Sequence, residues 1–152
     1  MKVWCAYIGG SKTDWPRGGL ALDRQDNVYL VGGTDSSDFP TTEETFRRRP
    51  RGERDAAIVK LSADGAELLF GTLLGGSSWD GLMGIQVDKH GDVYVAGYMR
   101  STDFPVTSAA LQSTQRGGRQ PQQGDGILAV LSPDGSRPDC YMRRTWEVVE
   151  TT

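Results

Sequence analysis

The sequence contains no long run of apolar residues, and only 37% of its 152 residues are apolar. No segment approaches the roughly 20 apolar residues that a membrane-spanning helix needs. The chain also has only two cysteines, Cys5 and Cys140, and one histidine, His90. Two cysteines are too few for a disulfide framework, and whether they pair stays open. Because the cysteines lie far apart and the histidine stands alone, no metal-site spacing occurs, and we expect no metal and no cofactor.

An excess of positive charge is absent as well. The 17 Lys and Arg residues face 20 Asp and Glu residues, which gives a net charge of −3. Without a global basic field, we expect neither nucleic acid nor an anionic membrane as a partner. The first ten residues, MKVWCAYIGG, lack the long apolar stretch of a secretory signal. Either the protein stays inside the cell or its true N-terminus lies further upstream.

The chain is rich in glycine, with 20 residues, and it contains an internal repeat. The stretch Asp26–Pro40, DNVYLVGGTDSSDFP, returns 65 residues later at Gly91–Pro105 as GDVYVAGYMRSTDFP. Seven of the fifteen paired positions are identical. Such a repeat indicates a fold built from one recurring unit.

Short strands joined by tight turns make up this unit. Asn and Asp near Gly in the turns RQDN and KHGD supply the backbone angles that hairpins need. A first strand, Met1–Ile8, matches Leu68–Leu74 but has no hairpin partner, whereas a fourth strand after Ser136 is degraded in sequence. The other predicted strands are Leu20–Asp23, Val28–Val31, Ala56–Leu61, Ile85–Asp88, Val93–Ala96 and Ile127–Leu131.

Three of these strands, Val28–Val31, Val93–Ala96 and Ile127–Leu131, are apolar on both faces. A strand of this kind needs cover on both sides of its sheet. No long amphipathic helix is available, so neighbouring four-stranded sheets must supply the cover, as in a β-propeller or a linear stack of sheets. We therefore predict an all-β fold with antiparallel four-stranded blades of a β-propeller, of which about two are present. Residues 1–10 would be the last strand of a preceding blade, 11–76 and 77–143 two repeats, and 144–152 an irregular tail.

A known family shares this order of motifs. The segments YIGGS, LALDRQDNVYLVGG, DFP and RDAAIVKLSADG together resemble the SBBP β-propeller repeat of bacteria. The resemblance runs from Tyr7 to about Gly135, and the chain departs from it after Ser136 and in the insert after Arg116. It implies a propeller of seven or a similar number of blades in a large secreted or surface protein, hence an extracellular or cell-surface location. It implies no reaction.

Nine predicted strands are too few for a ring, because closed propellers have about four to eight four-stranded blades. Each outer face of a two-blade unit would expose apolar side chains to water. We expect either a fragment of a longer chain or an assembly of copies, so that further blades of the same chain or a homo-oligomer complete the ring. The partnerless strand Met1–Ile8 favours the fragment.

The loops before Leu20 and before Ile85 should line one mouth of the ring. They hold Asp14 and Trp15 in the first copy and Trp79 and Asp80 in the second. An indole for stacking and a carboxylate for hydrogen bonds would suit a sugar or peptide ligand. The alternative is that Trp packs between blades and Asp caps a turn.

The densest charge is the run Arg47, Arg48, Arg49 and Arg51, with Arg54 close by. It could contact a phosphate or another polyanion. The alternative is a solvated loop, because the second copy carries mostly Gln there.

The DFP segments hold repeated aspartates, Asp38 and Asp103, which we expect to bond backbone N–H groups in a turn. Four apolar side chains should fold these segments back on the sheet: Phe39, Phe46, Phe104 and Leu111.

No single-copy catalytic set is present. We predict a non-catalytic repeat module that serves as a scaffold or as a protein- or glycan-binding surface. The alternative is a fragment of a propeller enzyme, a polysaccharide hydrolase or lyase, with its catalytic residues in other blades.

Overall fold

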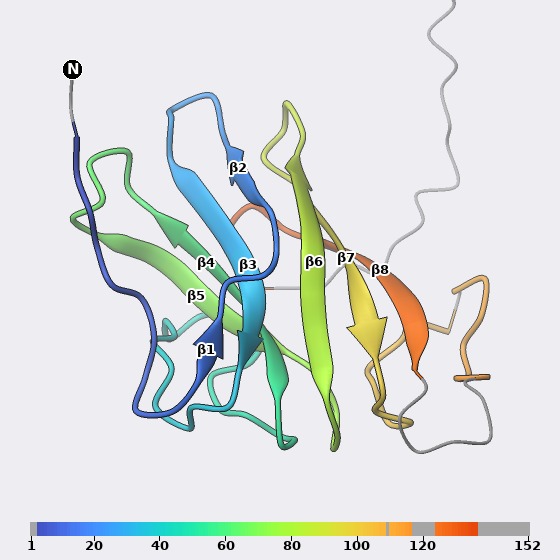
Figure 1. The fold of residues 1–152 in the computed structure, drawn as a ribbon. Coiled ribbons are helices and arrows are strands. Elements are labelled where there is room, and N and C mark those ends of the chain that lie inside the picture. Colours follow the sequence, from blue (N-terminus) through green and yellow to red (C-terminus); the bar gives the residue numbers. More distant parts are fainter. Residues whose placement is uncertain (1–2, 109, 117–123, 137–152) are drawn as a thin grey trace, which may run out of the picture.

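The computed structural model describes residues 3–108, 110–116 and 124–136, which form two antiparallel sheets and no helix (Figure 1). Consequently no helix in the described part is long and apolar enough to cross a membrane. The first sheet contains five strands and the second contains three. Their bounds are β1 Asp14–Trp15, β2 Leu20–Leu22, β3 Val28–Thr34, β4 Asp55–Leu61, β5 Leu68–Leu74, β6 Asp80–Val87, β7 Val93–Met99 and β8 Asp125–Leu131.

Each sheet is the antiparallel ladder that the repeat predicts. In the first sheet β3 pairs with β4 and β4 with β5, and in the second β6 pairs with β7 and β7 with β8. The all-β prediction with antiparallel blades is therefore confirmed. Strands β3 and β7 run three residues beyond their predicted ends at Val31 and Ala96. In β3 the continuation passes through Gly32, where a side chain would not fit. A Cβ there would lie 2.1 Å from the Trp15 carbonyl oxygen.

The first strand position of the first sheet is split. Both β1 and β2 pair with β3. Pro16 follows β1 directly and has no N–H to donate, so the ladder stops there. In the second sheet one strand, β6, fills the same position, with an irregular register between Leu82 and Gly84. The prediction that Asp14, Trp15 and Asp80 lie in loops is therefore wrong, because β1 and β6 extend to these residues.

The two ends of the molecule differ (Figure 1). One end, the short-turn end, holds the tight turns between β2 and β3, between β4 and β5 and between β6 and β7. Asp23 Oδ1 accepts hydrogen bonds from the N–H groups of Gln25 and Asn27, and Gly91 adopts a φ of 89° in the equivalent turn of the second sheet. The other end, the long-loop end, holds residues 9–13, 35–54, 75–79 and the described parts of 100–124.

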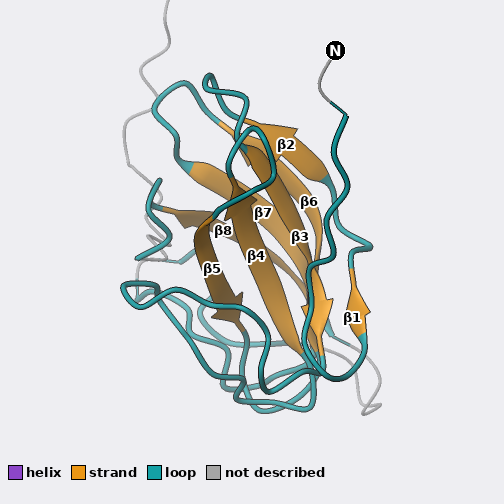
Figure 2. Ribbon diagram, turned by 90° about the vertical axis from the view of Figure 1, so that its left-hand side faces the viewer, coloured by secondary structure: helices purple, strands orange, loops and turns teal. Residues whose placement is uncertain are grey.

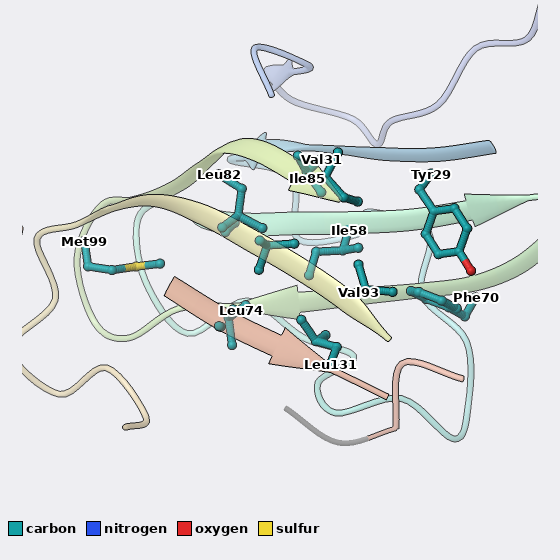
Figure 3. Packing of buried hydrophobic residues seen from close by; sticks show 13 residues of the cluster. Tyr29, Val31, Ile58, Phe70, Leu74, Leu82, Ile85, Val93, Met99 and Leu131 are labelled. Atoms are coloured by element: carbon teal, nitrogen blue, oxygen red, sulfur yellow. The ribbon is translucent and has the colours of Figure 1, made fainter. Parts of the chain in front are cut away.

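The main core lies between the two sheets (Figure 3). Tyr29 meets Phe70 edge to face, with ring centroids 6.0 Å apart. Ile58 from the first sheet and Val93 and Val95 from the second are fully buried. This packing face to face is what strands apolar on both sides require. The full buried cluster is Tyr29, Val31, Ala56, Ile58, Phe70, Leu74, Leu82, Ile85, Val93, Val95, Met99, Ala129 and Leu131.

A second apolar cluster lies on the opposite face of the first sheet. Phe39, Val59 and Leu73 are buried there, and Ile8 of the N-terminal segment packs against them. Residues 3–10 run alongside the first sheet without pairing in a ladder (Figure 2). The expected strand ladder at Met1–Ile8 is thus not formed over 3–8, because no strand of the described chain pairs with this segment. Its assignment to a preceding blade stays a prediction.

The DFP segments fold back much as expected. Phe39 is 8% exposed, and Phe46 and Phe104 pack against the main core. Leu111 is 91% exposed, so its predicted packing role is wrong. The insert around it holds few apolar residues that could cover it. The degraded fourth strand of the second copy and Cys140 lie outside the described residues, whereas Cys5 is exposed and unpaired.

Candidate functional site

The residues singled out from the sequence gather at the long-loop end. This end receives the connections from β3 to β4, from β5 to β6 and from β7 to β8 (Figure 1). Asp14, Trp15, Trp79 and Asp80 stand where β1 and β6 begin, and the arginine run lies in the β3–β4 connection. Because loops on a rigid sheet carry most binding sites, this end is the candidate functional surface.

The Asp14 carboxylate is turned toward its own loop. Its Oδ2 accepts hydrogen bonds from Gly10 N at 2.7 Å and from Ser36 Oγ at 3.2 Å. Its Oδ1 accepts one from Thr34 Oγ1 at 2.5 Å. These bonds fasten residues 10–14 to the end of β3. Asp14 therefore acts as a turn cap, and its oxygens are occupied.

Asp80 repeats this arrangement with deeper burial. Its side chain is fully buried, and Oδ2 accepts bonds from Gly76 N at 2.7 Å and Ser101 Oγ at 2.6 Å. Oδ1 accepts the backbone N–H groups of Arg100 and Ser101 at 3.1 and 3.2 Å. A carboxylate with four donors and no access to solvent has no capacity left for a ligand.

The aspartates of the DFP segments have the predicted turn role. Asp38 Oδ1 accepts the N–H and the hydroxyl of Ser11, and Asp103 Oδ1 accepts the same two groups of Ser77. These hydrogen bonds, led by the backbone N–H, hold the pKa values of Asp38 and Asp103 below the ordinary value of 3.8. Because Asp38 and Asp103 accept the same bonds in the two copies, we assign both a structural role in the turn.

The two tryptophans face each other across Arg54. The Arg54 guanidinium carbon lies 3.4 Å from the centroid of the Trp15 ring and 4.3 Å from that of Trp79. The Arg17 guanidinium carbon lies 5.4 Å from the Trp15 centroid, and that of Arg100 lies 5.4 Å from the Trp79 centroid. Two rings and three guanidinium groups thus gather in one cluster, which we call the Trp–Arg ladder: Arg17, Trp15, Arg54, Trp79 and Arg100. Each contact is a cation–π interaction.

Arg54 is the fixed centre of this ladder. Its side chain is 4% exposed, and its Nε and Nη2 donate to the two carboxylate oxygens of Asp35 at 2.7 and 3.0 Å. The hydrogen bond to Asp35 raises the pKa of Arg54 further above its ordinary value. Trp79 Nε1 donates to a Glu53 carboxylate oxygen. The buried charge of Arg54 is thus paired with Asp35, and a buried charge without a partner would be costly.

The arginine run borders a separate hollow of about 650 Å³. Arg47 turns inward, and its Nη1 donates to the Gly75 carbonyl at 2.6 Å. Arg48 lies 4.0 Å from a Glu43 oxygen and Arg51 lies 3.5 Å from an Asp103 oxygen, with both side chains more than half exposed. Within the described part of the chain, Arg49 has no ion pair within 4.0 Å. The lining residues, which define the arginine hollow, are Ser37, Asp38, Phe39, Thr41, Phe46, Arg47, Arg48, Arg49, Pro50 and Arg51.

Asp55 is a buried carboxylate that the sequence analysis did not single out. Its Oδ2 accepts the N–H groups of Arg51 and Gly52 at 2.6 and 3.4 Å. Its Oδ1 has no hydrogen-bond partner. Burial raises the pKa of Asp55 above 3.8, although the two backbone bonds act in the opposite direction. The one histidine of the sequence, His90, is exposed in a turn at the short-turn end, far along the chain from Asp55.

Residues 3–108, 110–116 and 124–136 contain no group of three or more His, Cys, Asp or Glu side chains that could hold a metal ion. The long-loop end offers aromatic rings and guanidinium groups to a ligand, whereas the carboxylates of Asp14, Asp38, Asp80 and Asp103 bond to the loops. Sequence reasoning placed both tryptophans at this end. It missed that Arg54 joins them, since no repeat partner for Arg54 marks the contact.

A search of curated proteins found no significant match to the chain. Residues 3–40 match the family model described as SBBP, Beta-propeller repeat. The match covers the segment from the N-terminal residues through β1, β2 and β3 to the first DFP motif. The two antiparallel sheets packed face to face agree with partial blades of a β-propeller, and residues 3–40 are similar to the SBBP β-propeller repeat.

Proposed function

We propose that the chain is a non-catalytic propeller module whose long-loop end binds an acidic polysaccharide. The observation that carries this proposal is the division of charge at that end. Carboxylates that recur in both copies, such as Asp14 and Asp80, bond to backbone and hydroxyl groups, whereas Arg48, Arg49 and Arg51 face solvent. Guanidinium groups bind carboxylate and sulfate groups through paired hydrogen bonds.

The ladder supports the choice of a sugar polymer. Trp15 and Trp79 are partly exposed beside the cations Arg17 and Arg100. Indole rings stack on the apolar faces of sugar rings, and neighbouring guanidinium groups reach acidic substituents. A linear polymer could contact both the ladder and the arginine hollow, because residues 47–54 connect the two. An extracellular or cell-surface location, which the resemblance to the SBBP family implies, would suit this ligand and belongs to the proposal.

Titration of the protein with polygalacturonate, a polymer of uronic acid, tests the proposed function, with neutral dextran as the comparison polymer. The substitutions Arg48→Gln, Arg49→Gln and Arg51→Gln are combined in one variant, because the second copy naturally carries mostly Gln in this loop. We expect this variant to bind polygalacturonate at least tenfold more weakly, and wild-type binding to weaken as salt screens the charges.

The matched control replaces two exposed cations at the short-turn end, Arg24→Gln and Lys89→Gln. It changes the net charge by nearly as much and should leave the affinity unchanged. If dextran bound as tightly as polygalacturonate, the proposed ligand would be wrong. If both variants lost the same affinity for polygalacturonate, a site at the long-loop end would be refuted.

A further inference from the structure

The outer face of the second sheet is apolar and exposed. Leu128 on β8 is 67% exposed and Tyr94 on β7 is 40% exposed, with Ala96 and Val130 beside them in the ladder. In the repeat, Tyr94 corresponds to Tyr29 and Leu128 to Ile58, both of which are fully buried against the second sheet. The exposed face of the second sheet is therefore equivalent to the face of the first sheet that packs on the second sheet.

The first sheet carries the complementary surface. Leu20 and Leu22 on β2 are 62% and 53% exposed. They correspond to Ile85 and Val87 on β6, which pack into the core between the sheets. One chain thus presents, at its two opposite flanks, both halves of the interface that it already forms inside.

The strand edges show the same complementarity. In the described part of the chain β8 pairs only with β7, whereas its equivalent β4 pairs with β3 and also with β5. Residues 3–8 have no ladder partner, and by the Gly-Gly turns that follow them they are the equivalent of β5.

The contacts of this segment support that equivalence. Trp4 lies against Gly65 in the β4–β5 turn, just as Phe70 on β5 lies against Gly135 after β8. Gly10 N donates to Asp14 at 2.7 Å, as Gly76 N does to Asp80. Residues 3–10 therefore occupy, beside the first sheet, the place that β5 occupies beside the second.

We propose that copies of this chain associate head to tail. Residues 3–8 of one copy add to the edge of β8 that no described strand covers, in the next copy, as the fourth strand of its second blade. At the same time the Tyr94 and Leu128 face of that copy packs on Leu20 and Leu22. Both contacts arise from a single docking geometry, the one that relates the two sheets within the chain.

This contact is heterologous, so it either closes into a ring or continues as a filament. Each copy supplies two blades, and propellers have about four to eight. A closed ring would thus contain two to four copies. The inference does not depend on the ligand of the long-loop end.

The first experiment is sedimentation velocity on the full chain and on two single variants, Leu128→Glu and Leu20→Glu. We expect the wild-type protein to associate as its concentration rises, and each variant to associate at least tenfold more weakly. Mixing the two variants should give a one-to-one dimer that grows no further, because each still holds one intact face. Leu111→Glu, a change at a more exposed leucine away from both faces, is the control and should associate like the wild type.

The second experiment tests the strand register. Gly71 pairs with Val59 in the first sheet, so the equivalent Cys5 should lie opposite Ala129 of the next copy. Opposed residues in an antiparallel pair have Cα atoms about 4.5–5.5 Å apart, a distance that a disulfide spans. In a Cys140→Ser background, Ala129→Cys should give disulfide-linked dimers and larger species under mild oxidation. Ile127→Cys, which lies two residues out of register, should give at least tenfold less disulfide-linked product.

Three results would overturn the proposal. The first is a wild-type chain that stays monomeric at every concentration while Ala129→Cys gives no linked dimer, as expected if residues 137–152 of the same chain cover β8. The second is a disulfide between residues 5 and 129 within one chain. The third is a mixture of Leu128→Glu and Leu20→Glu that fails to pair although the wild type associates, which would indicate a symmetric interface instead.

Discussion

At the residue scale, Asp23 illustrates a difference between the two copies of the repeat, because it forms an ion pair with Lys60. It lies 3.0 Å from Lys60 Nζ, and the Tyr29 hydroxyl is 3.4 Å away. Burial acts to raise the pKa of Asp23, but the hydrogen bonds from Asn27 and Lys60 outweigh it and lower the pKa to about 2. The equivalent Asp88 has Val130 where Lys60 stands, so it caps its turn without a cation.

We therefore expect Asp23→Asn to lower the free energy of unfolding by about 1–2 kcal/mol at pH 7. Because the pKa is lower in the folded state than the ordinary 3.8, this contribution is complete above that value and is lost as the pH falls toward 2. Urea unfolding at pH 7 and pH 3 measures it, and the cost should fall by about half at pH 3.

Asp88→Asn is the matched control, since it removes a turn cap without an ion pair. At pH 7 it should lower the free energy of unfolding by less than Asp23→Asn does. Equal costs for both variants would mean that the Lys60 pair adds nothing.

Gly75 illustrates a constraint of space. A Cβ there would lie 2.0 Å from Asp55 Oδ1 and 2.9 Å from Asp80 Oδ2, and both carboxylates are buried. Gly75→Ala should cost about 2–4 kcal/mol in urea unfolding, because neither group can move away. Gly84→Ala, whose Cβ would meet nothing closer than 4.0 Å, should change stability by less than about 0.5 kcal/mol. A mild effect at Gly75 would show that the β5–β6 turn shifts easily.

At the scale of elements, the Trp–Arg ladder ties β1, β4 and β6 together. Arg54→Lys keeps the charge but loses the paired bonds to Asp35 and the flat surface between the two rings. We expect a loss of about 2 kcal/mol, measured by urea unfolding followed by circular dichroism. Arg17→Lys at the exposed end of the ladder should cost less than about 0.5 kcal/mol. Similar losses of unfolding free energy for Arg54→Lys and Arg17→Lys would mean that Arg54 does not stabilise the ladder more than Arg17 does.

The elements were predictable where local chemistry decides them. Asp23 and Asp88 cap turns whose residues favour hairpins, so most strand bounds agree with the prediction to within a few residues. Contacts between distant loops were not predictable, and the Arg54 stack depends on how β1 and β6 approach each other. The repeat also concealed differences between the copies, such as Lys60 against Val130, because equal spacing says nothing about charge.

At the scale of the whole molecule, the two exposed apolar flanks decide how stability depends on concentration. A partner that binds only the folded chain adds about 2.7 kcal/mol when its concentration is about 100 times the dissociation constant. For a chain of this size that corresponds to a rise in melting temperature of roughly 5–10 °C. We expect such a rise between dilute and concentrated wild-type protein in thermal melts followed by circular dichroism.

Leu128→Glu should melt at nearly the same temperature at both concentrations, because the charge disrupts the Tyr94 and Leu128 face, while its dilute melting temperature should stay close to that of the dilute wild type. Leu128 is 67% exposed, so its loss removes little packing within one copy. A wild-type melting temperature that is independent of concentration would mean that one copy buries its flanks without help. The apolar faces would then need cover from within the same chain, and the head-to-tail contact would be excluded.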